Sequence, residues 1–517
     1  MTNDSVSTGS RTLADVAAHL CDRGFSATVR GDAALVLNGV TQDSRACPPG
    51  SLFLAMPGET VDGTRFIDAA FEAGAGAALC GDAVAPKHSS ANLLVVDDVL
   101  RASGHAASYL NGAAAESLRL VGVTGTNGKT SCTYLLESVW TAAGLRSGIL
   151  GTVSARWPGA ERPSAMTTPA VVELHQLLAE MHAAQCTVAA LEVSSHALAQ
   201  HRIAGCEFDV GVFTNLTRDH LDYHGDEESY LDAKALLFEE YVAESGTCVI
   251  NAEDPSCDRL IRAAGARRTL TYSSTPDTKA DVVASVISST LDGMTLEISQ
   301  AGDAVELRTR LLGAPNVSNI AAVAAAAAAM GHSLDTVAAG IEAANPVPGR
   351  LERVGMGRPA VLVDYAHTPD ALERTLLTVR DMLAGGRLIC VFGCGGDRDR
   401  GKRPMMGSAA GRLADITVLT SDNPRTESPD AIIAEIEVGV AGHASLSDQV
   451  GLKTGNACYA IEPDRKTAIA TALESASADD VVLVAGKGHE DYQETGGVRR
   501  HFDDREVVAA LQADHAG

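Results

Sequence analysis

The sequence predicts an α/β protein of three domains, with sheets that are mostly parallel and doubly wound. The chain has 517 residues, 45% of them hydrophobic, which is enough for several cores at roughly 100–200 residues per domain. Short apolar runs typical of buried strands alternate with helical patterns over most of the length. Two prolines and a glycine at residues 346–349 mark a linker between two such regions.

The first domain, expected at residues 1–108, is predicted to be a small α/β unit. Residues 51–56 and 93–96 have the apolar character of strands, and residues 66–73 that of a helix. The segment TQDSR at residues 41–45 lies between such elements, in a loop suited to recognition of a polar ligand.

The middle domain, expected at residues 109–346, begins with a buried-type strand, a glycine loop and a helix. Its strands are expected at residues 120–123, 188–193 and 210–214, and its first helix at residues 131–143. Residues 282–311 switch to an alternating pattern with a turn at Asp292-Gly293, which predicts antiparallel strands. The alanine-rich run at residues 320–329 indicates a closely packed helix, for which Asn316 and Asn319 give a defined start.

The third domain, expected at residues 347–517, repeats the alternation of strands and helices. Its strands are expected at residues 360–363, 388–392, 416–420 and 481–485, and its helices at residues 370–383 and 465–475. This order is typical of a mostly parallel, doubly wound sheet.

Composition excludes several classes of partner. With 66 acidic and 41 basic residues, the net charge of −25 repels nucleic acid and anionic membranes, so a bound anionic substrate would need a groove that reverses this sign locally. No run approaches the ~20 apolar residues of a membrane span, and the polar start lacks a secretory signal, so we expect a cytoplasmic protein. The 11 cysteines contain no CxxC pair, which argues against disulfides or structural zinc.

The strongest local signal is GVTGTNGKTS at residues 122–131, between a strand and a helix. Backbone N–H groups of such a loop can cradle phosphates, with Lys129 at the β/γ oxygens and the Thr130 hydroxyl on Mg²⁺. The spacing departs from GxxxxGK[ST], because Gly122 stands one position early and Val123 takes the place of the first glycine. A chance glycine turn is the competing interpretation, against which the strand–loop–helix context argues.

Polar side chains follow two further strands of the middle domain. Glu192 ends one strand, and the segment NLTRDHLDYH at residues 215–224 follows another. Carboxylates and imidazoles gathered at one sheet edge suit a hard cation such as Mg²⁺. Singly, a strand-end Glu can be a cap, a loop His a solvated residue and Lys234 a solvent-facing lysine. Beside a phosphate loop, together they indicate a site.

With these motifs the chain resembles the Mur ligases, ATP-dependent enzymes that add amino acids to peptidoglycan precursors. The resemblance runs from Asp43 nearly to the C-terminus. Its motifs, in order, are GTNGKT at residues 125–130, EVSSH at 192–196, TNL at 214–216, DHLD at 219–222, the segment 230–234, Asn316 and Asn319, PGRLE at 348–352, DYAH at 364–367 and GKGHE at 486–490.

The resemblance implies an N-terminal UDP-substrate-binding domain, a central P-loop-type ATPase domain and a C-terminal Rossmann-like domain. It also implies that a carboxylate is activated as an acyl phosphate and then attacked by an amine. DNPR at residues 422–425 marks, by resemblance, the branch that adds meso-diaminopimelate to UDP-N-acetylmuramoyl-L-alanyl-D-glutamate. Without the family context the same residues indicate only an Asn-Pro turn before a helix.

Site residues follow from the same motifs. The catalytic set is Lys129, Glu192, His220 and Lys234. The metal ligands are Thr130, Glu192, His220 and Lys234, the last as a carbamate formed with CO₂, because an ammonium cannot bind a cation. The nucleotide set is Gly125, Thr126, Asn127, Gly128, Lys129, Thr130, Ser131, Asn316, Arg350 and Asp364.

The substrate contacts are likewise expected from the resemblance. The UDP-muramoyl-dipeptide set is Gln42, Ser44, Glu59, Thr60, Val61, Thr167, Thr168, Ser194, Gln200 and Arg202. The diaminopimelate set is Arg398, Asp422, Asn423, Pro424, Arg425, Gly486 and Glu490. Met166 departs from the family pattern, since some members have Asn before the paired threonines.

Two other interpretations stay open. The chain could be a lysine-adding enzyme or another Mur-type or folylpolyglutamate-type amide ligase. It could instead be a nucleotide-binding regulatory or scaffold protein without chemistry, although the intact Lys129, Thr130, Glu192, His220 and Lys234 argue against this. A monomer is expected.

Overall fold

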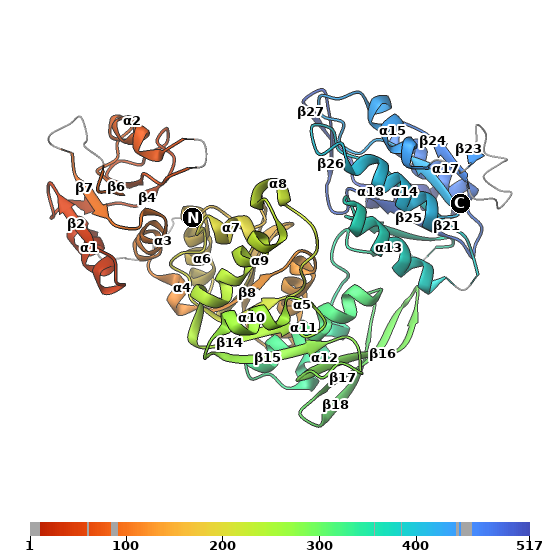
Figure 1. Ribbon diagram of the computed structural model, residues 1–517, viewed down its shortest axis with the longest axis horizontal. Coiled ribbons are helices and arrows are strands. Elements are labelled where there is room, and N and C mark those ends of the chain that lie inside the picture. Colours follow the sequence, from red (N-terminus) through yellow and green to blue (C-terminus); the bar gives the residue numbers. More distant parts are fainter. Residues whose placement is uncertain are drawn as a thin grey trace. The chain divides into compact units, whose positions relative to one another are not determined.

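The computed structural model describes residues 11–58, 61–83, 91–355, 357–383, 385–440, 444–445 and 458–516 (Figure 1). The chain forms two compact units. The first consists of Met1–Val283, Ile298–Val305 and Ser318–Gly340, and the second of Ala284–Glu297, Glu306–Val317 and Ile341–Gly517. The three domain boundaries expected from the sequence stay a prediction.

The first unit begins with a five-stranded sheet of order β2-β7-β6-β5-β4. Only β2 runs antiparallel to its neighbour. Helix α1 starts with a capping box between Thr12 and Asp15 and buries its apolar face. The elements are β1 (Arg11–Thr12), α1 (Leu13–Asp22), β2 (Ala27–Arg30), β3 (Val36–Leu37), β4 (Val40–Thr41), β5 (Leu52–Leu54), η1 (Gly63–Phe66), α2 (Ile67–Glu72), β6 (Ala77–Gly81), β7 (Leu93–Val96) and α3 (Val99–Leu110).

An eleven-stranded sheet follows, of order β11-β10-β9-β12-β8-β13-β14-β15-β16-β17-β18. The strands from β9 to β16 in this order are parallel. The elements are α4 (Ala114–Ser117), β8 (Arg119–Thr124), α5 (Lys129–Ala142), β9 (Ser147–Leu150), β10 (Ser154–Trp157), β11 (Ala160–Pro163), α6 (Val171–Ala183), β12 (Val188–Glu192), α7 (Ser195–Ala199), β13 (Phe208–Phe213), α8 (Leu221–His224), α9 (Glu227–Leu236), η2 (Leu237–Tyr241), β14 (Val242–Asn251), α10 (Cys257–Ala264), β15 (Arg268–Ser273), β16 (Val282–Thr290), β17 (Gly293–Gln300), β18 (Asp303–Thr309), α11 (Ala314–Ala329) and α12 (Leu334–Ala343).

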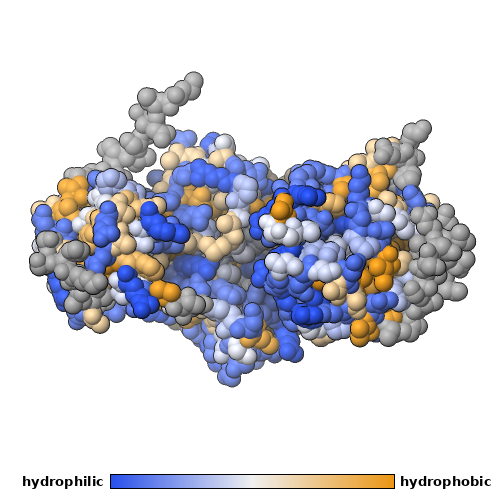
Figure 2. Space-filling model, turned by 90° about the horizontal axis from the view of Figure 1, so that it is seen from above, coloured by the Kyte–Doolittle hydropathy of each residue, from blue (hydrophilic) through white to orange (hydrophobic). Residues whose placement is uncertain are grey.

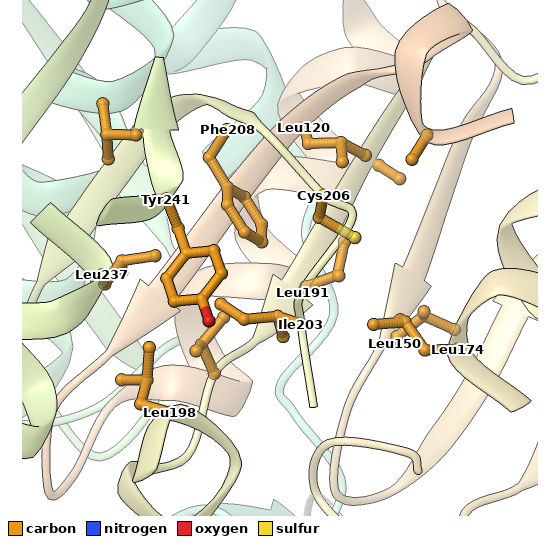
Figure 3. Packing of buried hydrophobic residues seen from close by; sticks show 14 of the residues in the cluster. Leu120, Leu150, Leu174, Leu191, Leu198, Ile203, Cys206, Phe208, Leu237 and Tyr241 are labelled. Atoms are coloured by element: carbon orange, nitrogen blue, oxygen red, sulfur yellow. The ribbon is translucent and has the colours of Figure 1, made fainter. Parts of the chain in front are cut away.

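A large apolar core supports this sheet. Figure 3 shows Leu120, Leu191 and Phe208 of the central strands packed with side chains that include Leu174 and Leu237. The segment η2 is a π-helical turn that continues α9, and the N–H of Val242 closes it by donating to the carbonyl of Leu237. The phosphate-loop strand β8 is packed into this core through Leu120.

The second unit contains a seven-stranded sheet of order β19-β20-β25-β21-β22-β24-β23. All its pairs except β19–β20 are parallel. The elements are β19 (Glu352–Val354), β20 (Ala360–Asp364), α13 (Pro369–Met382), β21 (Leu388–Phe392), α14 (Lys402–Leu413), β22 (Ile416–Leu419), α15 (Pro429–Glu437), η3 (Val438–Val440), β23 (Ala444–Ser445), β24 (Cys458–Ile461), α17 (Arg465–Ser475), β25 (Val481–Ala485), β26 (Tyr492–Thr495), β27 (Val498–His501) and α18 (Asp504–Ala516).

Both faces of this sheet are covered, as a doubly wound arrangement requires. Leu362, Cys390 and Leu483 pack on one face with side chains of α13, α14 and α15. Their sequence neighbours point to the other face, where α17 and α18 pack. The predicted α/β class with mostly parallel sheets is confirmed.

Several details differ from the sequence-based expectation. Helix α11 begins at Ala314, so Asn316 and Asn319 lie inside it rather than at its start. The antiparallel hairpins β10–β11 and β26–β27 have no counterpart among the predicted elements. The turn predicted at Asp292-Gly293 is present, however, and joins β16 to β17.

The surface and the cysteines agree with the composition. Hydrophilic side chains cover most of the face seen in Figure 2. The cysteines of the described part of the chain are free thiols, and most are buried. Among the helices of the described residues, none has the length and apolar character needed to cross a membrane.

Candidate active site

The phosphate loop lies between β8 and α5. Gly125 has a φ of 139° and Gly128 a φ of 91°, both in the region that favours glycine. A Cβ at Gly125 would collide with the Thr214 hydroxyl, and one at Gly128 with the side-chain oxygen of Asn319. Both glycines are therefore needed for the close approach of β13 and α11 to the loop.

Asn215, which follows β13, accepts hydrogen bonds from this loop just before α5 begins. The N–H of Thr126 donates to the Asn215 carbonyl (2.8 Å), and the N–H of Asn127 to Asn215 Oδ1 (3.0 Å). Lys129 Nζ donates to the carbonyls of Gly125 (2.8 Å) and Thr126 (2.9 Å). Ser131 lies in the buried first turn of the helix. A helix N-terminus beneath such a loop can bind an anion.

Glu192 ends β12, the strand next to β8, and is buried. Its two carboxylate oxygens accept hydrogen bonds from the N–H (2.8 Å) and hydroxyl (2.9 Å) of Thr152. A Cβ at Gly151 would collide with this carboxylate. Thr130 is also buried, in the first turn of α5. Parallel pairing therefore brings Glu192 to the sheet edge that carries the phosphate loop.

Lys234 lies on α9 and is 1% exposed. Burial lowers the pKa of its amine well below the usual value; nearby Lys129 lowers it further, and Asp219 opposes both. The Lys234 Nζ lies 4.2 Å from the centre of the Tyr230 ring. The Tyr230 hydroxyl is 3.2 Å from that of Thr126, which joins α9 to the phosphate loop.

His220 completes the expected set at this edge. It has a left-handed φ of 53° at the start of α8, and its Nε2 lies 3.6 Å from Asp219 Oδ2. Burial is the largest cause of a lowered pKa for its imidazole, and the charges of Lys129 and Lys234 act in the same direction. Lys129, His220 and Lys234 thus lie within electrostatic reach of one another.

His196 packs against His220, and Tyr223 and His224 pack against His196; the sequence alone does not indicate a role for these three rings. His196 lies 4.8 Å from His220 and 4.2 Å from Tyr223 between ring centroids, and His224 lies 5.1 Å from Tyr230. Burial lowers the pKa of His224 to about 4, so its ring is neutral near pH 7. Their only sequence signal is their place inside the EVSSH and DHLDYH segments.

The residues expected along the muramoyl-dipeptide path form one cluster. The Thr168 hydroxyl lies 3.3 Å from Ser194 Oγ, and Thr167 Oγ1 lies 3.1 Å from the hydroxyl of Thr152. Arg202 Nε donates to Gln200 Oε1 (2.8 Å). Since Thr152 also binds Glu192, this cluster adjoins the expected metal position.

Met166 is part of this cluster, since its Sδ accepts a hydrogen bond from Arg202 Nη1 (3.4 Å). The UDP-end residues lie apart from it, on the five-stranded sheet: Gln42 and Ser44 follow β4, and Val61 is 41% exposed. Glu59 and Thr60 lie outside the described residues.

In the second unit, Arg350 and Asp364 lie at the C-terminal end of β20. Asp364 accepts hydrogen bonds from the N–H groups of Leu351 (2.7 Å) and Ala366 (2.9 Å). Burial raises the pKa of Asp364, and the charge of Arg350 opposes that rise. The Arg350 guanidinium lies 4.7 Å from the Tyr365 ring centroid. Asn316 Nδ2 donates to the Leu312 carbonyl (2.9 Å).

The residues expected to hold the amino acid meet at the ends of β22 and β25. Asn423 Nδ2 donates to Glu490 Oε2 (2.8 Å). Gly486 has a φ of 115°, and a Cβ there would lie 2.9 Å from Asp422 Oδ2. Burial raises the pKa of Glu490, and the charge of Asp422 raises it further. Lys487, which the motif analysis does not assign to this site, lies fully buried among these side chains.

Arg425 adopts a left-handed φ of 53° after buried Pro424. Its Nη1 donates to the Gly396 carbonyl (2.7 Å), and its backbone N–H donates to the carbonyl of Glu494 in β26 (2.9 Å). The unpredicted β26–β27 hairpin therefore helps to orient this side chain. Arg398 is exposed on the neighbouring loop.

Two carbonyls at this site are held from beneath by a buried arginine. Arg465 pairs with Asp504 through two bonds of 2.7 Å, and both side chains are fully buried. The Arg465 guanidinium also donates to the carbonyls of Ser421 (3.2 Å) and Ala485 (3.0 Å). These carbonyls immediately precede Asp422 and Gly486, so the ion pair fixes two strand ends at once.

Among the described residues, no group of three or more His, Cys, Asp or Glu side chains is placed to hold a metal ion. The expected metal set contains only two such residues, Glu192 and His220. It therefore depends on the Thr130 hydroxyl and on chemistry at Lys234.

Family models match the chain in three consecutive stretches. Residues 36–109 match the Mur ligase family catalytic domain, residues 123–327 the Mur ligase middle domain, and residues 349–488 the Mur ligase glutamate ligase domain. A relative from Nostoc sp. is 44% identical over 92% of this chain and 94% of its own length. One from Synechococcus elongatus is 45% identical over 93% and 95%. Both are named UDP-N-acetylmuramoyl-L-alanyl-D-glutamate–2,6-diaminopimelate ligase.

Solved structures agree with the sequence comparisons. A structure of a ligase with the same name has a TM-score of 0.71 and 33% identity, and the match covers 98% of this chain and 100% of that one. MurF from Acinetobacter baumannii, with 17% identity and a TM-score of 0.60, shares the fold. The matched stretches and the identity over nine-tenths of the chain lead to one conclusion: the protein belongs to the Mur ligase family.

Proposed function

We propose that the protein catalyses the ATP-dependent addition of meso-diaminopimelate to UDP-N-acetylmuramoyl-L-alanyl-D-glutamate in peptidoglycan precursor synthesis. The cluster of side chains at the ends of β22 and β25 carries this proposal, because buried Asp422 and half-buried Glu490 lie beside the turn that bears Arg425. Diaminopimelate has an ammonium and a carboxylate at each end, which suits such a pairing of charges. The names of the relatives point to the same substrate pair.

The reaction must first activate a carboxylate. An oxygen of the D-glutamyl γ-carboxylate attacks the γ-phosphorus of ATP, the bond to the β-phosphate oxygen breaks, and ADP leaves. The amine nitrogen then attacks the acyl carbon, phosphate leaves, and the nitrogen loses its proton. Two anions approach in the first step, so Lys129 and the N–H groups of the phosphate loop would stabilise the charge that develops.

Magnesium fits the residues at this edge. Thr130 and Glu192 supply oxygen donors beside the phosphate loop, and His220 and Lys234 lie on its other side. Bound Mg²⁺ would neutralise charge on the transferred phosphoryl group. Ring contacts with His196 and Tyr230 would keep the His220 imidazole in place.

Lys234 is suited to carbamate formation. Only a neutral amine adds to CO₂, forming an N–C bond and releasing one proton, and burial lowers the pKa of Lys234 in favour of the neutral amine. The product has two oxygens that share one negative charge, which an ammonium lacks. We therefore propose this carbamate as the fourth ligand group.

The rival amide ligases are less well supported. Escherichia coli FolC has a TM-score of 0.57 and 21% identity over 79% of this chain, a likeness that concerns the fold alone. Since the proposed steps need no residue from a second chain, we propose a monomer. The nucleotide-linked substrate and ATP lead us to propose the cytoplasm as its location.

The test compares meso-diaminopimelate, lysine and ornithine by ADP release with the UDP-muramoyl-dipeptide. A guanidinium at residue 425 can bind the far carboxylate of diaminopimelate with two parallel hydrogen bonds, which an ammonium cannot reproduce. Losing one partner of such a pair costs ~2–5 kcal/mol. Arg425→Ala should therefore lower kcat/KM for diaminopimelate about 30-fold or more, and activity with lysine should stay low or rise slightly.

The matched control is Arg412→Ala, which removes an exposed arginine of the same unit that pairs with Glu373 on the surface. It should leave the substrate preference unchanged. A wild-type preference for lysine, or an Arg425→Ala variant that still prefers diaminopimelate, would contradict the proposal.

A further inference from the structure

Lys487 is fully buried in the loop that follows β25, among the side chains expected to hold the amino acid. Its Nζ lies 3.3 Å from Asn423 Oδ1, 3.4 Å from Glu490 Oε2 and 3.7 Å from Asp422 Oδ1. The ring centroid of Tyr492 lies 5.4 Å away. A fully buried lysine is rare unless it is paired, and here one ammonium faces two carboxylates.

The charges of this cluster do not cancel. Two carboxylates and one ammonium leave a net charge of −1 when all are ionised. Asp422 Oδ1 is buried and makes no hydrogen bond within the described part of the chain, since 3.7 Å to Lys487 is too long for one. The cluster therefore has room for one further cationic donor, which the ammonium of an amino acid would supply.

We infer that Lys487 is a positioning residue that keeps the Glu490 carboxylate, beside Asp422, aimed at the ammonium of the incoming amino acid. This inference rests on the proposed function. The lysine need not touch the substrate. It reduces the repulsion between the Asp422 and Glu490 carboxylates, and its bond to Asn423 fixes the amide whose Nδ2 binds Glu490.

Loss of Lys487 should make amino-acid binding more sensitive to acid. Burial and Asp422 raise the pKa of Glu490, whereas the charge of Lys487 and the Asn423 hydrogen bond lower it. Without the ammonium this pKa rises further, so Glu490 becomes protonated at a higher pH and no longer binds an ammonium. Other charged or titratable groups that act on Glu490 include Tyr365, Arg465, Tyr492 and Arg499, and all four remain in the variant.

The experiment measures KM for meso-diaminopimelate, ATP and the UDP-muramoyl-dipeptide across pH in Lys487→Met and Lys487→Arg. Lys487→Met keeps the side-chain length without charge. It should raise KM for diaminopimelate about 30-fold, as expected for a buried charge left unpaired, and change the other two values less than about 3-fold. The acid limb of kcat/KM for diaminopimelate should move to higher pH, and Lys487→Arg should restore part of both effects.

Arg387→Met is the matched control, because it breaks the ion pair between Arg387 and Asp480, at the ends of β21 and β25 opposite the Lys487 cluster. It measures the effect of a loss of stability without a change at the Lys487 cluster. The inference is overturned if Lys487→Met raises all three KM values alike, or if its acid limb stays in place.

Measuring the effect of Lys487→Met in a Glu490→Gln variant tests whether Lys487 acts through Glu490. If Lys487 acts through Glu490, then Lys487→Met should add less than about 2-fold to the KM of Glu490→Gln, and independent effects would overturn the inference. If Lys487→Met does not fold, Lys487→Gln takes its place in both comparisons. The wild type separates failure of this inference from failure of the proposed function. If the proposed function is wrong, the wild type itself shows no ADP release with diaminopimelate.

Discussion

Lys129 and Lys234 are close in space, but their surroundings prepare them for different chemistry. Lys129 donates to carbonyls of the phosphate loop, so a full positive charge is accommodated there. Lys234 is buried beside the Tyr230 ring, and its pKa is lowered well below the usual value. Burial thus favours the neutral amine at Lys234, which is the form that can act as a nucleophile.

Lys234→Ala should nearly abolish ligation with the fold intact, because the carbamate oxygens are lost. Lys234→Arg should not rescue activity, since a guanidinium stays protonated and does not add CO₂. Ligation is measured as ADP release and folding by the thermal transition, with exposed Lys466→Ala as the control. Full activity of either Lys234 variant in CO₂-depleted buffer would rule out the carbamate.

At the scale of elements, the ends of β22 and β25 depend on the ion pair between Arg465 and Asp504. Asp504→Asn should lower the free energy of unfolding of this region by ~3–5 kcal/mol, because the variant leaves a buried guanidinium without its counter-charge. Chemical denaturation followed by circular dichroism measures this loss. KM for the amino acid should rise too, as the Ser421 and Ala485 carbonyls are released.

The double variant Arg465→Met/Asp504→Leu provides the comparison, because removing both charges leaves none unpaired. It should be more stable than Asp504→Asn alone. Equal losses in the two variants would mean that packing, rather than the charge pair, stabilises these strand ends.

Elements with strong periodicity could be predicted from the sequence. The strands at Leu93–Val96, Leu388–Phe392 and Val481–Ala485 have the predicted bounds, because each is a short apolar run buried on both faces. The hairpin of Tyr492–Thr495 and Val498–His501 could not be found in this way. Its strands are mostly exposed and polar, so no alternation of burial marks them.

The same contrast applies to the site. The phosphate loop and Glu192 could be placed together, because parallel strands bring their carboxyl ends to one edge. The support that Arg465, Lys487 and the β26–β27 hairpin give to residues 422–425 depends on contacts between segments ~40–70 residues apart. Side-chain hydrogen bonds over such distances follow no local pattern in the chain.

At the scale of the whole molecule, the nucleotide loop and the residues expected at the UDP end belong to different sheets of the first unit. Lys129→Ala removes the point charge nearest the transferred phosphoryl group, so ligation should fall by orders of magnitude. Affinity for the UDP-muramoyl-dipeptide, measured by calorimetry, should change little. Parallel loss of ligation and of this affinity would mean that the domains have been assigned wrongly.

The π-helical turn Leu237–Tyr241 has a consequence for insertions and deletions. A π turn contains about one residue more than an α-helical turn, and so it offsets the angular phase of the residues after it by roughly 100°. Lys234 comes before this offset, whereas Tyr241, which bonds to His201 (2.7 Å), comes after it. The extra residue lets each side chain face its own partner. Deleting exposed Glu239 would restore the α-helical phase and rotate either Lys234 or Tyr241 away from its place.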